Sequence, residues 1–358
     1  MWYDTRASKI LGTQYPIMQG PFGGGISTVE LLSTVSNNGG LGGFGAYTMS
    51  PQEIISLDKQ IKAATDKPYN INLWVSDTDA PDGTVSDEVF ENTKRLFKPY
   101  FDEAGIALPE KPPTFSSRFE NQVEAILEIQ PRVFSFVFGI PDKEVLEQCR
   151  KRGIKTIGAA TTLEEGKALD AAGVDMIIAS GFESGGHRPS FLGSAERSTM
   201  GTFVLLQLIR EKVNTPVIAS GGIASGKGAA AAFTLGADAV QMGTAFLACD
   251  ESGALPIHRQ LLFSDASSRT VLTRTFTGRL GRGITNRIIE DLFSKERPFL
   301  PFPLQSTFLS SLRKAALDQQ KSDMVFFWSG QIAPIVKETK AKKLMQSIVE
   351  DTTRILAR

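Results

Sequence analysis

The chain has 358 residues, 41% of them hydrophobic, and its 39 basic and 39 acidic residues give a formal net charge of zero. This length suits one large globular domain with an appendage, and a neutral chain has no basic field to attract nucleic acid or an anionic membrane. Two separated cysteines, Cys149 and Cys249, argue against a disulfide framework, and the N-terminus lacks an apolar secretion signal. We therefore expect a cytoplasmic protein with small-molecule partners and no membrane span.

Eight short runs rich in apolar and β-branched residues follow one another along the chain, each ending in small or polar residues. Such runs are typical of buried strands. In chain order, the predicted strands are 15–19, 40–45, 69–75, 132–139, 154–159, 174–180, 215–222 and 238–244.

The segments between these runs predict helices. Four helix starts are marked by a hydroxyl residue suited to the N-cap position, namely Ser27, Ser50, Thr162 and Ser225. Because strands alternate with helices, neighbouring strands should be parallel, and eight such units favour a closed (β/α)8 TIM barrel. An open doubly wound sheet is the alternative, although the first strand-to-helix turn does not fit the glycine spacing of a dinucleotide-binding motif.

Two stretches interrupt the alternation. Residues 76–120 are rich in Pro, Asp and Ser and predict a lid-like insertion with an embedded helix. Residues 245–330 predict a mostly helical subdomain after the eighth strand. The expected organisation is therefore a barrel over 1–244 that carries the insertion, the helical subdomain, and a C-terminal segment over 331–358 whose helix packs back on the barrel.

Glycine-rich turns follow the seventh and eighth predicted strands. Gly221 and Gly222 let backbone amides approach an anion closely, and Ser225 can cap the next helix, whose N-terminus adds positive partial charge. Gly243 and Thr244 offer a second amide pair with a hydroxyl group. Since barrel enzymes commonly hold phosphate between these two loops, we predict a phosphate site here.

His187 follows the sixth predicted strand and should point into the same barrel mouth. The adjacent Gly185 and Gly186 would leave room for a planar cofactor. An imidazole there can take up a proton or stabilise an anion, Glu183 could orient it, and Arg188 could contact the negative oxygens of a substrate.

Other kinds of chemistry find little support. The second histidine, His258, lies in a helical context without glycines and is expected to be structural. The sequence has neither the histidine and cysteine spacing of a metal site nor a nucleophile elbow, so we predict no metal site and no hydrolase. Cofactor chemistry remains.

Nearly the whole chain resembles the nitronate monooxygenase family, formerly called 2-nitropropane dioxygenases, which are FMN-dependent TIM barrels. The resemblance is carried by motifs along nearly the full length: "PIMQGPFGGGIST", "NINLW", "FSFVFGIP", "GFESGGHRPSF", "PVIASGGI", "GADAVQMGTAFL", "TGRLGRGITN" and "WSGQ".

This resemblance implies a catalytic role for His187 and FMN as cofactor. The FMN contacts that it implies are Met18, Gln19, Gly20, Asn72, Gly186, Ser220, Gly221, Gly222, Met242, Gly243, Thr244 and Gln331. The implied reaction is oxidation of alkyl nitronates, and of nitroalkanes where His187 removes the α proton, by O2 to a carbonyl compound and nitrite. An NAD(P)H-dependent flavin reductase acting on a quinone or enoyl thioester is the alternative on this scaffold. A barrel that binds a flavin or phosphosugar without catalysis stays open, and so does a homodimer.

Overall fold

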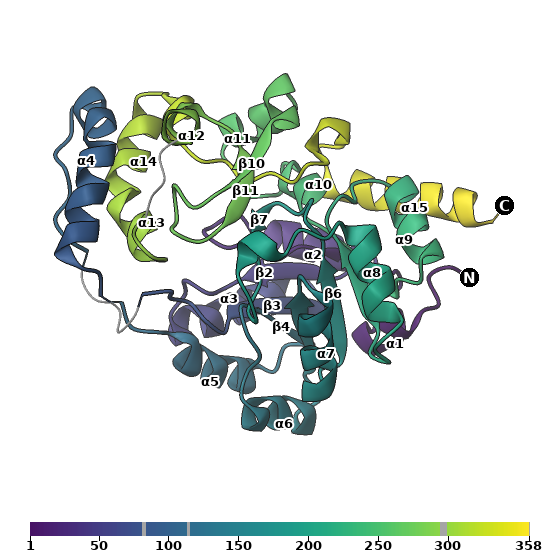
Figure 1. Ribbon diagram of the computed structural model, residues 1–358. Coiled ribbons are helices and arrows are strands. Elements are labelled where there is room, and N and C mark those ends of the chain that lie inside the picture. Colours follow the sequence, from purple (N-terminus) through teal and green to yellow (C-terminus); the bar gives the residue numbers. More distant parts are fainter. Residues whose placement is uncertain (81–83, 113–114, 294–298, 358) are drawn as a thin grey trace.

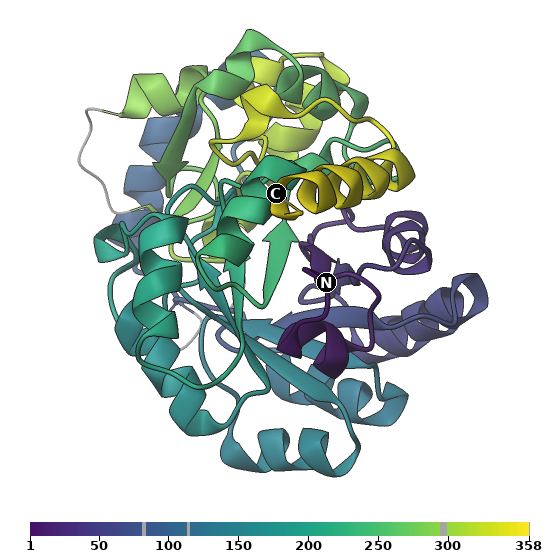
Figure 2. The same ribbon diagram turned by 90° about the vertical axis from the view of Figure 1, so that its right-hand side faces the viewer.

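A barrel of eight parallel strands forms the centre of the molecule (Figures 1 and 2). The computed structural model describes residues 1–80, 84–112, 115–293 and 299–357. A parallel bridge between Met18 and Leu41 joins the two edge strands, so the sheet closes on itself and the predicted TIM barrel is confirmed. The barrel strands are β1 (Ile17–Gln19), β2 (Gly42–Gly45), β3 (Tyr69–Trp74), β4 (Val133–Val137), β5 (Lys155–Ala160), β6 (Met176–Ser180), β8 (Val217–Ser220) and β9 (Ala239–Met242).

Helices surround this barrel. They are α2 (Val29–Asn37), α3 (Pro51–Ala64), α5 (Phe119–Ile129), α6 (Lys143–Lys151), α7 (Leu163–Ala172), α8 (Thr202–Arg210) and α9 (Gly226–Thr234). The C-terminal helix α15 (Ala341–Leu356) packs against α9 and α2, so it fills the gap in the ring between the last and the first strand (Figure 2).

The helix-start signals have mixed outcomes. Ser50 and Thr162 are N-caps whose side chains accept backbone N–H bonds, as predicted. The cap of α2 is Thr28, one residue after the predicted Ser27. Ser225 occupies the N-cap position of α9, but its side chain forms no capping hydrogen bond.

The barrel interior is filled by side chains at the end opposite the strand C-termini. Met18, Leu41, Met176 and Ile218 belong to one apolar cluster there, to which Leu11 of the short helix α1 (Arg6–Leu11) also contributes. The interior is therefore a packed core rather than a channel, and the opposite, carboxyl end is left for a site.

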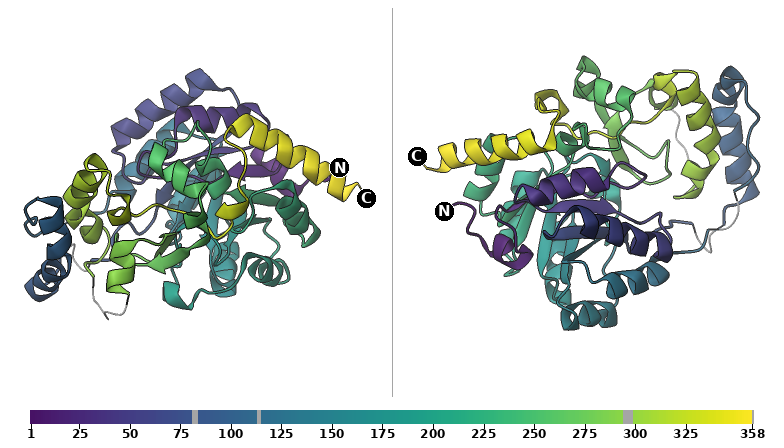
Figure 3. Two further views of the ribbon diagram at one scale, coloured as in Figure 1. Left: turned by 90° about the horizontal axis from the view of Figure 1, so that it is seen from above. Right: turned by 180° about the vertical axis from the view of Figure 1, so that it is seen from behind.

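A second apolar core lies beside the barrel. Helix α4 (Asp87–Ala104), from the insertion, packs against α14 (Ser310–Asp318), far away in sequence (Figures 1 and 3). Phe97, Phe308 and Leu312 are fully or almost fully buried in this core. The two interrupting stretches thus share one core, and the predicted division into domains stays a prediction. The other helices beyond β9 are α10 (Thr244–Leu247), α11 (Pro256–Leu262), α12 (Arg287–Leu292) and α13 (Leu304–Phe308).

A three-stranded antiparallel sheet was not predicted. The strands β10 (Thr270–Thr273) and β11 (Gly281–Ile284) form a hairpin inside the stretch expected to be mostly helical, and β11 also pairs with β7 (Gly186–His187). The β-branched run over 270–273 was the available signal. This sheet attaches the stretch after the barrel to the segment that carries the histidine.

Among the described residues, no helix is both long and apolar enough to cross a membrane.

Candidate active site

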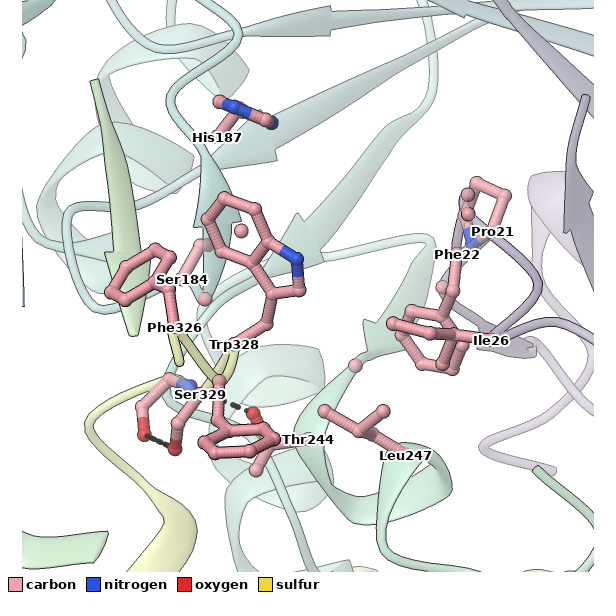
Figure 4. A pocket seen from close by; sticks show the side chains of 18 of the residues that line it. Pro21, Phe22, Ile26, Ser184, His187, Thr244, Leu247, Phe326, Trp328 and Ser329 are labelled. Carbon is pink, nitrogen blue, oxygen red and sulfur yellow. Dashed lines mark hydrogen bonds between the residues drawn. The ribbon is translucent and has the colours of Figure 1, made fainter. Parts of the chain in front are cut away.

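A cavity of about 750 Å³ opens at the carboxyl ends of the barrel strands. Its lining comes from the loops after the strands on one side and from the second core on the other. Figure 4 shows Trp328 between His187 and Thr244, with Phe22, Ile26 and Leu247 across the hollow. A volume of this size falls in the range of small-molecule and cofactor sites.

His187 reaches this cavity from strand β7. The pairing of His187 with Gly281 of β11 fixes its backbone, and its Nε2 atom lies 2.9 Å from Oγ1 of Thr277. Aromatic rings surround the imidazole at centroid distances of 4.7 to 6.4 Å. They belong to Trp74, Phe138, Phe302 and Trp328.

This environment keeps the imidazole neutral. Burial among the rings, reinforced by the positive charge of Arg279, lowers the pKa of His187 to about 3. The guanidinium of Arg279 lies 4.1 Å from the centroid of the Phe138 ring and 4.6 Å from that of Phe302. At neutral pH, His187 is therefore a base or a neutral hydrogen-bonding group rather than a cation.

The turn after β8 adopts a backbone conformation that favours glycine. Gly221 has φ +107° and Gly222 has φ +66°. A Cβ atom on Gly221 would lie 2.5 Å from Oγ of Ser184, so the position has no room for a side chain. On the neighbouring loop, Thr244 accepts a hydrogen bond of 2.9 Å from the backbone of Gly330. Close backbone packing thus fixes the position of the last two barrel loops, which line the cavity.

Nine of the predicted site residues line this cavity together. They are Gly20, Asn72, Gly186, His187, Ser220, Gly221, Gly222, Gly243 and Thr244. The structure therefore gathers residues from five different strands, or from the turns directly after them, into one space, as the barrel topology requires.

Four predicted residues are not among those that line the cavity. Met18 and Met242 are fully buried in the apolar cores. Gln19 is buried and accepts a hydrogen bond of 2.8 Å from the backbone of Gly43. Gln331 is exposed, and its backbone donates to the carbonyl of Glu183. A direct cofactor contact by these four side chains stays a prediction.

Two neighbours of His187 do not have the roles expected for them. The Glu183 carboxylate accepts hydrogen bonds from the backbone and hydroxyl group of Thr202, at the start of α8, rather than from the imidazole. Arg188 is 1% exposed and donates to the carbonyls of Gly181 and Ser198, so it braces its own loop instead of facing a substrate. Both side chains satisfy nearby backbone or hydroxyl groups, which sequence spacing did not reveal.

The glycines before His187 also have different reasons. A Cβ atom on Gly185 would lie 2.5 Å from the backbone nitrogen of Gly330, so this glycine permits two backbones to cross. Gly186 has φ +79° and open space around its missing side chain. Only Gly186 fits the expected clearance for a planar ligand.

Several lining residues were missed by the sequence analysis. Gln241 on β9 lines the cavity, and its buried Oε1 atom has no hydrogen-bond partner among the described residues. Trp74 and Tyr47 line it with stacked rings 3.7 Å apart. The position of Gln241 at the end of a strand was a usable signal, whereas the aromatic wall comes from segments far apart in sequence.

The described residues contain no cluster of His, Cys, Asp or Glu suited to a metal ion.

Comparisons with known proteins agree with this geometry. A family model described as nitronate monooxygenase matches residues 4–351. The chain is 36% identical over 360 residues to a probable nitronate monooxygenase of Staphylococcus saprophyticus, with 100% of both chains covered.

Two solved structures are also similar. The nitroalkane oxidase from Streptomyces ansochromogenes has a TM-score of 0.89 and 31% identity, with 99% of each chain covered. FabK from Thermotoga maritima has a TM-score of 0.74 and 27% identity, covering 99% of this chain and 97% of that one. With the barrel, the histidine and the glycine turns in place, the chain belongs to the nitronate monooxygenase family, a family of flavin oxidoreductases.

Proposed function

We propose that this protein uses FMN to oxidise alkyl nitronates, and neutral nitroalkanes, by O2 to a carbonyl compound and nitrite. The observation that carries this proposal is a neutral histidine in an aromatic-walled cavity whose other side is built from glycine turns. Bound flavin would supply the electron transfer between substrate and oxygen. The protein would bind, orient and, where needed, deprotonate the substrate.

The cavity has features that suit FMN. The backbone amides at Gly221–Gly222 and Gly243–Thr244, together with the N-terminus of α9 that has no side-chain cap, would hold the phosphate. The unpartnered buried oxygen of Gln241 and the open space at Gly186 suit the polar edge and flat face of an isoalloxazine ring. The four predicted residues that do not line the cavity would help to bind FMN only indirectly, by supporting the loops that contact it. They are Met18, Gln19, Met242 and Gln331.

Part of the cavity lining is apolar. This part includes Leu309, Leu312, Met324 and Phe327 from the second core. An alkyl group would leave water and pack against these side chains, which favours substrates with hydrocarbon substituents.

The role proposed for His187 depends on the charge of the substrate. A neutral nitroalkane has an acidic proton on its α carbon, and a neutral imidazole can remove it. A nitronate has already lost that proton. The substitution His187→Asn should therefore lower kcat/KM for a nitroalkane by about 100-fold or more, with a smaller effect on the matching nitronate and with flavin retained. Equal kcat/KM in wild type and variant would reject this role of His187, and absence of turnover in both would indicate a barrel that binds flavin without catalysis.

The similarity to FabK from Thermotoga maritima keeps an NAD(P)H-dependent flavin reductase as the second candidate. The visible absorption spectrum of the purified protein tests for flavin, and chromatography of the released cofactor distinguishes FMN from FAD. Mixing with NADH without oxygen, and separately with propyl nitronate in an oxygen electrode, distinguishes the two activities. We expect oxygen uptake and nitrite with nitronate and slow bleaching with NADH. Rapid bleaching without nitronate-dependent oxygen uptake would reject the proposal.

Location and assembly are part of the same proposal. Cys149 and Cys249 are buried free thiols, which suits a reducing cytoplasm. Burial raises the pKa of Cys149 to about 11, so that thiol has little reactive thiolate. A homodimer is proposed from the family resemblance, and light scattering after gel filtration measures it.

A further inference from the structure

The hydroxyl group of Thr277 has only one hydrogen, and the structure shows where it goes. Oγ1 of Thr277 donates to the backbone carbonyl of Arg279 at 2.9 Å, and a carbonyl can only accept. Toward Nε2 of His187, also 2.9 Å away, the same oxygen must then act as acceptor. The ring proton of His187 consequently lies on Nε2.

The opposite arrangement would leave a buried group without a partner. If Thr277 donated to His187, the carbonyl of Arg279 would lose the one donor seen at it in the described part of the chain. Arg279 is 5% exposed, and an unsatisfied carbonyl at such a position is unfavourable. The backbone of Arg279 also donates weakly back to Oγ1 at 3.3 Å, which agrees with an accepting hydroxyl oxygen.

The surroundings of the His187 ring favour its neutral form, which carries only one ring proton. Four aromatic rings and the positive charge of Arg279 surround His187 and disfavour the imidazolium form, which would hold a proton on each nitrogen. Arg279 is in turn paired with Asp79, so its charge is fixed in place. No hydrogen bond to Nδ1 is seen within the described residues, and His187 lines the cavity.

We propose that Thr277 is a positioning residue, which fixes His187 in the Nε2–H form and leaves the Nδ1 lone pair as the atom that accepts the substrate α proton. The second half of this statement rests on the proposed function, and the first does not. The hairpin of β10 and β11 makes the arrangement rigid, because Thr277 lies in its turn while β11 pairs with the backbone of His187. The histidine and the residue that sets its tautomer are thus held by one sheet.

Nitrogen NMR on protein labelled with ¹⁵N-histidine tests the tautomer directly, because the chain has only two histidines. The spectrum is recorded on the purified, flavin-loaded protein, and His187→Asn assigns the signals. We expect the pattern of a neutral ring protonated at Nε2, with a hydrogen-bonded ring proton. A ring protonated at Nδ1, or at both nitrogens near pH 7, overturns the inference whatever the protein oxidises.

Two substitutions then test Thr277 itself. Thr277→Val has nearly the same shape but no acceptor, so the hydrogen-bonded ring proton should be lost, whereas Thr277→Ser should keep it. Thr273→Val is the matched control, since Thr273 bonds Thr275 in the same hairpin, and it should leave the His187 signals in place. Unchanged His187 signals in Thr277→Val would overturn the assignment, and the wild-type spectrum still decides the tautomer if that variant does not fold.

Kinetics distinguish positioning from simple support. In Thr277→Val, kcat/KM for a neutral nitroalkane should fall about tenfold, the equivalent of one hydrogen bond, while the preformed nitronate should be nearly unaffected. Thr277→Ser should restore most of the loss. Equal losses on both substrates would overturn a role through the imidazole. Absence of any nitronate turnover in wild type would reject the proposed function and leave the NMR result standing.

Discussion

Arg279 and Asp79 form a salt bridge, in which Nε of Arg279 lies 2.8 Å from one carboxylate oxygen of Asp79. The two residues come from different interruptions of the barrel, Asp79 from the insertion after β3 and Arg279 from the turn between β10 and β11. Arg279 also donates to the carbonyl of Ser76 and lies over the rings beside His187. One guanidinium thus joins the insertion to the hairpin and adds positive charge at the histidine.

This relationship predicts the effect of Arg279→Met. Removal of the positive charge should raise the pKa of His187, because the imidazolium form would no longer face a neighbouring cation. An NMR titration of the imidazole measures the change. Arg282→Met is the control, since Arg282 is a buried cation on the neighbouring strand that does not contribute to the lowered pKa of His187. An equal rise in both variants would contradict the assigned role of Arg279.

The low pKa of His187 also predicts how stability depends on pH. Folding lowers this pKa from about 6.5 to about 3, so between these values the unfolded chain binds a proton that the folded chain does not. The contribution of His187 to stability is complete above about pH 6.5 and is lost as the pH falls toward 3.

Denaturant unfolding between pH 7 and pH 4.5 measures this dependence. His187→Asn should reduce the slope by up to about 1.4 kcal/mol per pH unit. His258 also has a lowered pKa and acts in the same direction, so the comparison must be between wild type and the single variant. Identical slopes in the two proteins would contradict the low pKa of His187.

The glycine turn after β8 predicts a specific loss of flavin. Gly222→Val forces a β-branched residue into φ +66°, so the backbone amides of the turn must move away from their present positions. We expect a cost of about 1 to 2 kcal/mol in stability and a nearly colourless protein.

Gly153→Val is the matched control for that substitution. Gly153 has φ +74°, has open space where a side chain would lie, and precedes β5 at the barrel end opposite the cavity. The Gly153→Val protein should be destabilised by about as much as Gly222→Val but should keep its yellow colour. The ratio of visible to ultraviolet absorbance measures this colour. Full flavin occupancy in Gly222→Val would reject the placement of the phosphate.

Arg188→Met should reveal a structural role for Arg188. The substitution leaves the carbonyls of Gly181 and Ser198 without their charged donor, which should lower the free energy of unfolding by about 3 kcal/mol. Arg197→Met, an exposed position in the same loop, should change it by no more than about 0.5 kcal/mol. Chemical denaturation measures both. Wild-type stability with a raised KM would return Arg188 to the substrate-binding role expected from sequence.

The sequence by itself determined the barrel and the general position of its site. Strand and helix signals are local, and once eight strands alternate with helices, parallel pairing brings the residues after each strand to one end. This is why His187, Gly222 and Thr244 could be placed together before the structure was known. The apolar positions that fill the barrel follow from the same periodicity.

Only the tertiary structure decided the contacts of polar side chains over long sequence separations. Glu183 and Arg188 are close to His187 in sequence, yet Glu183 binds the start of α8 and Arg188 binds backbone carbonyls of its own loop. No local pattern indicated that Thr277, 90 residues away, would contact the imidazole. Buried polar groups bind whichever partner the packing brings within reach, and that depends on how the hairpin and the second core settle on the barrel.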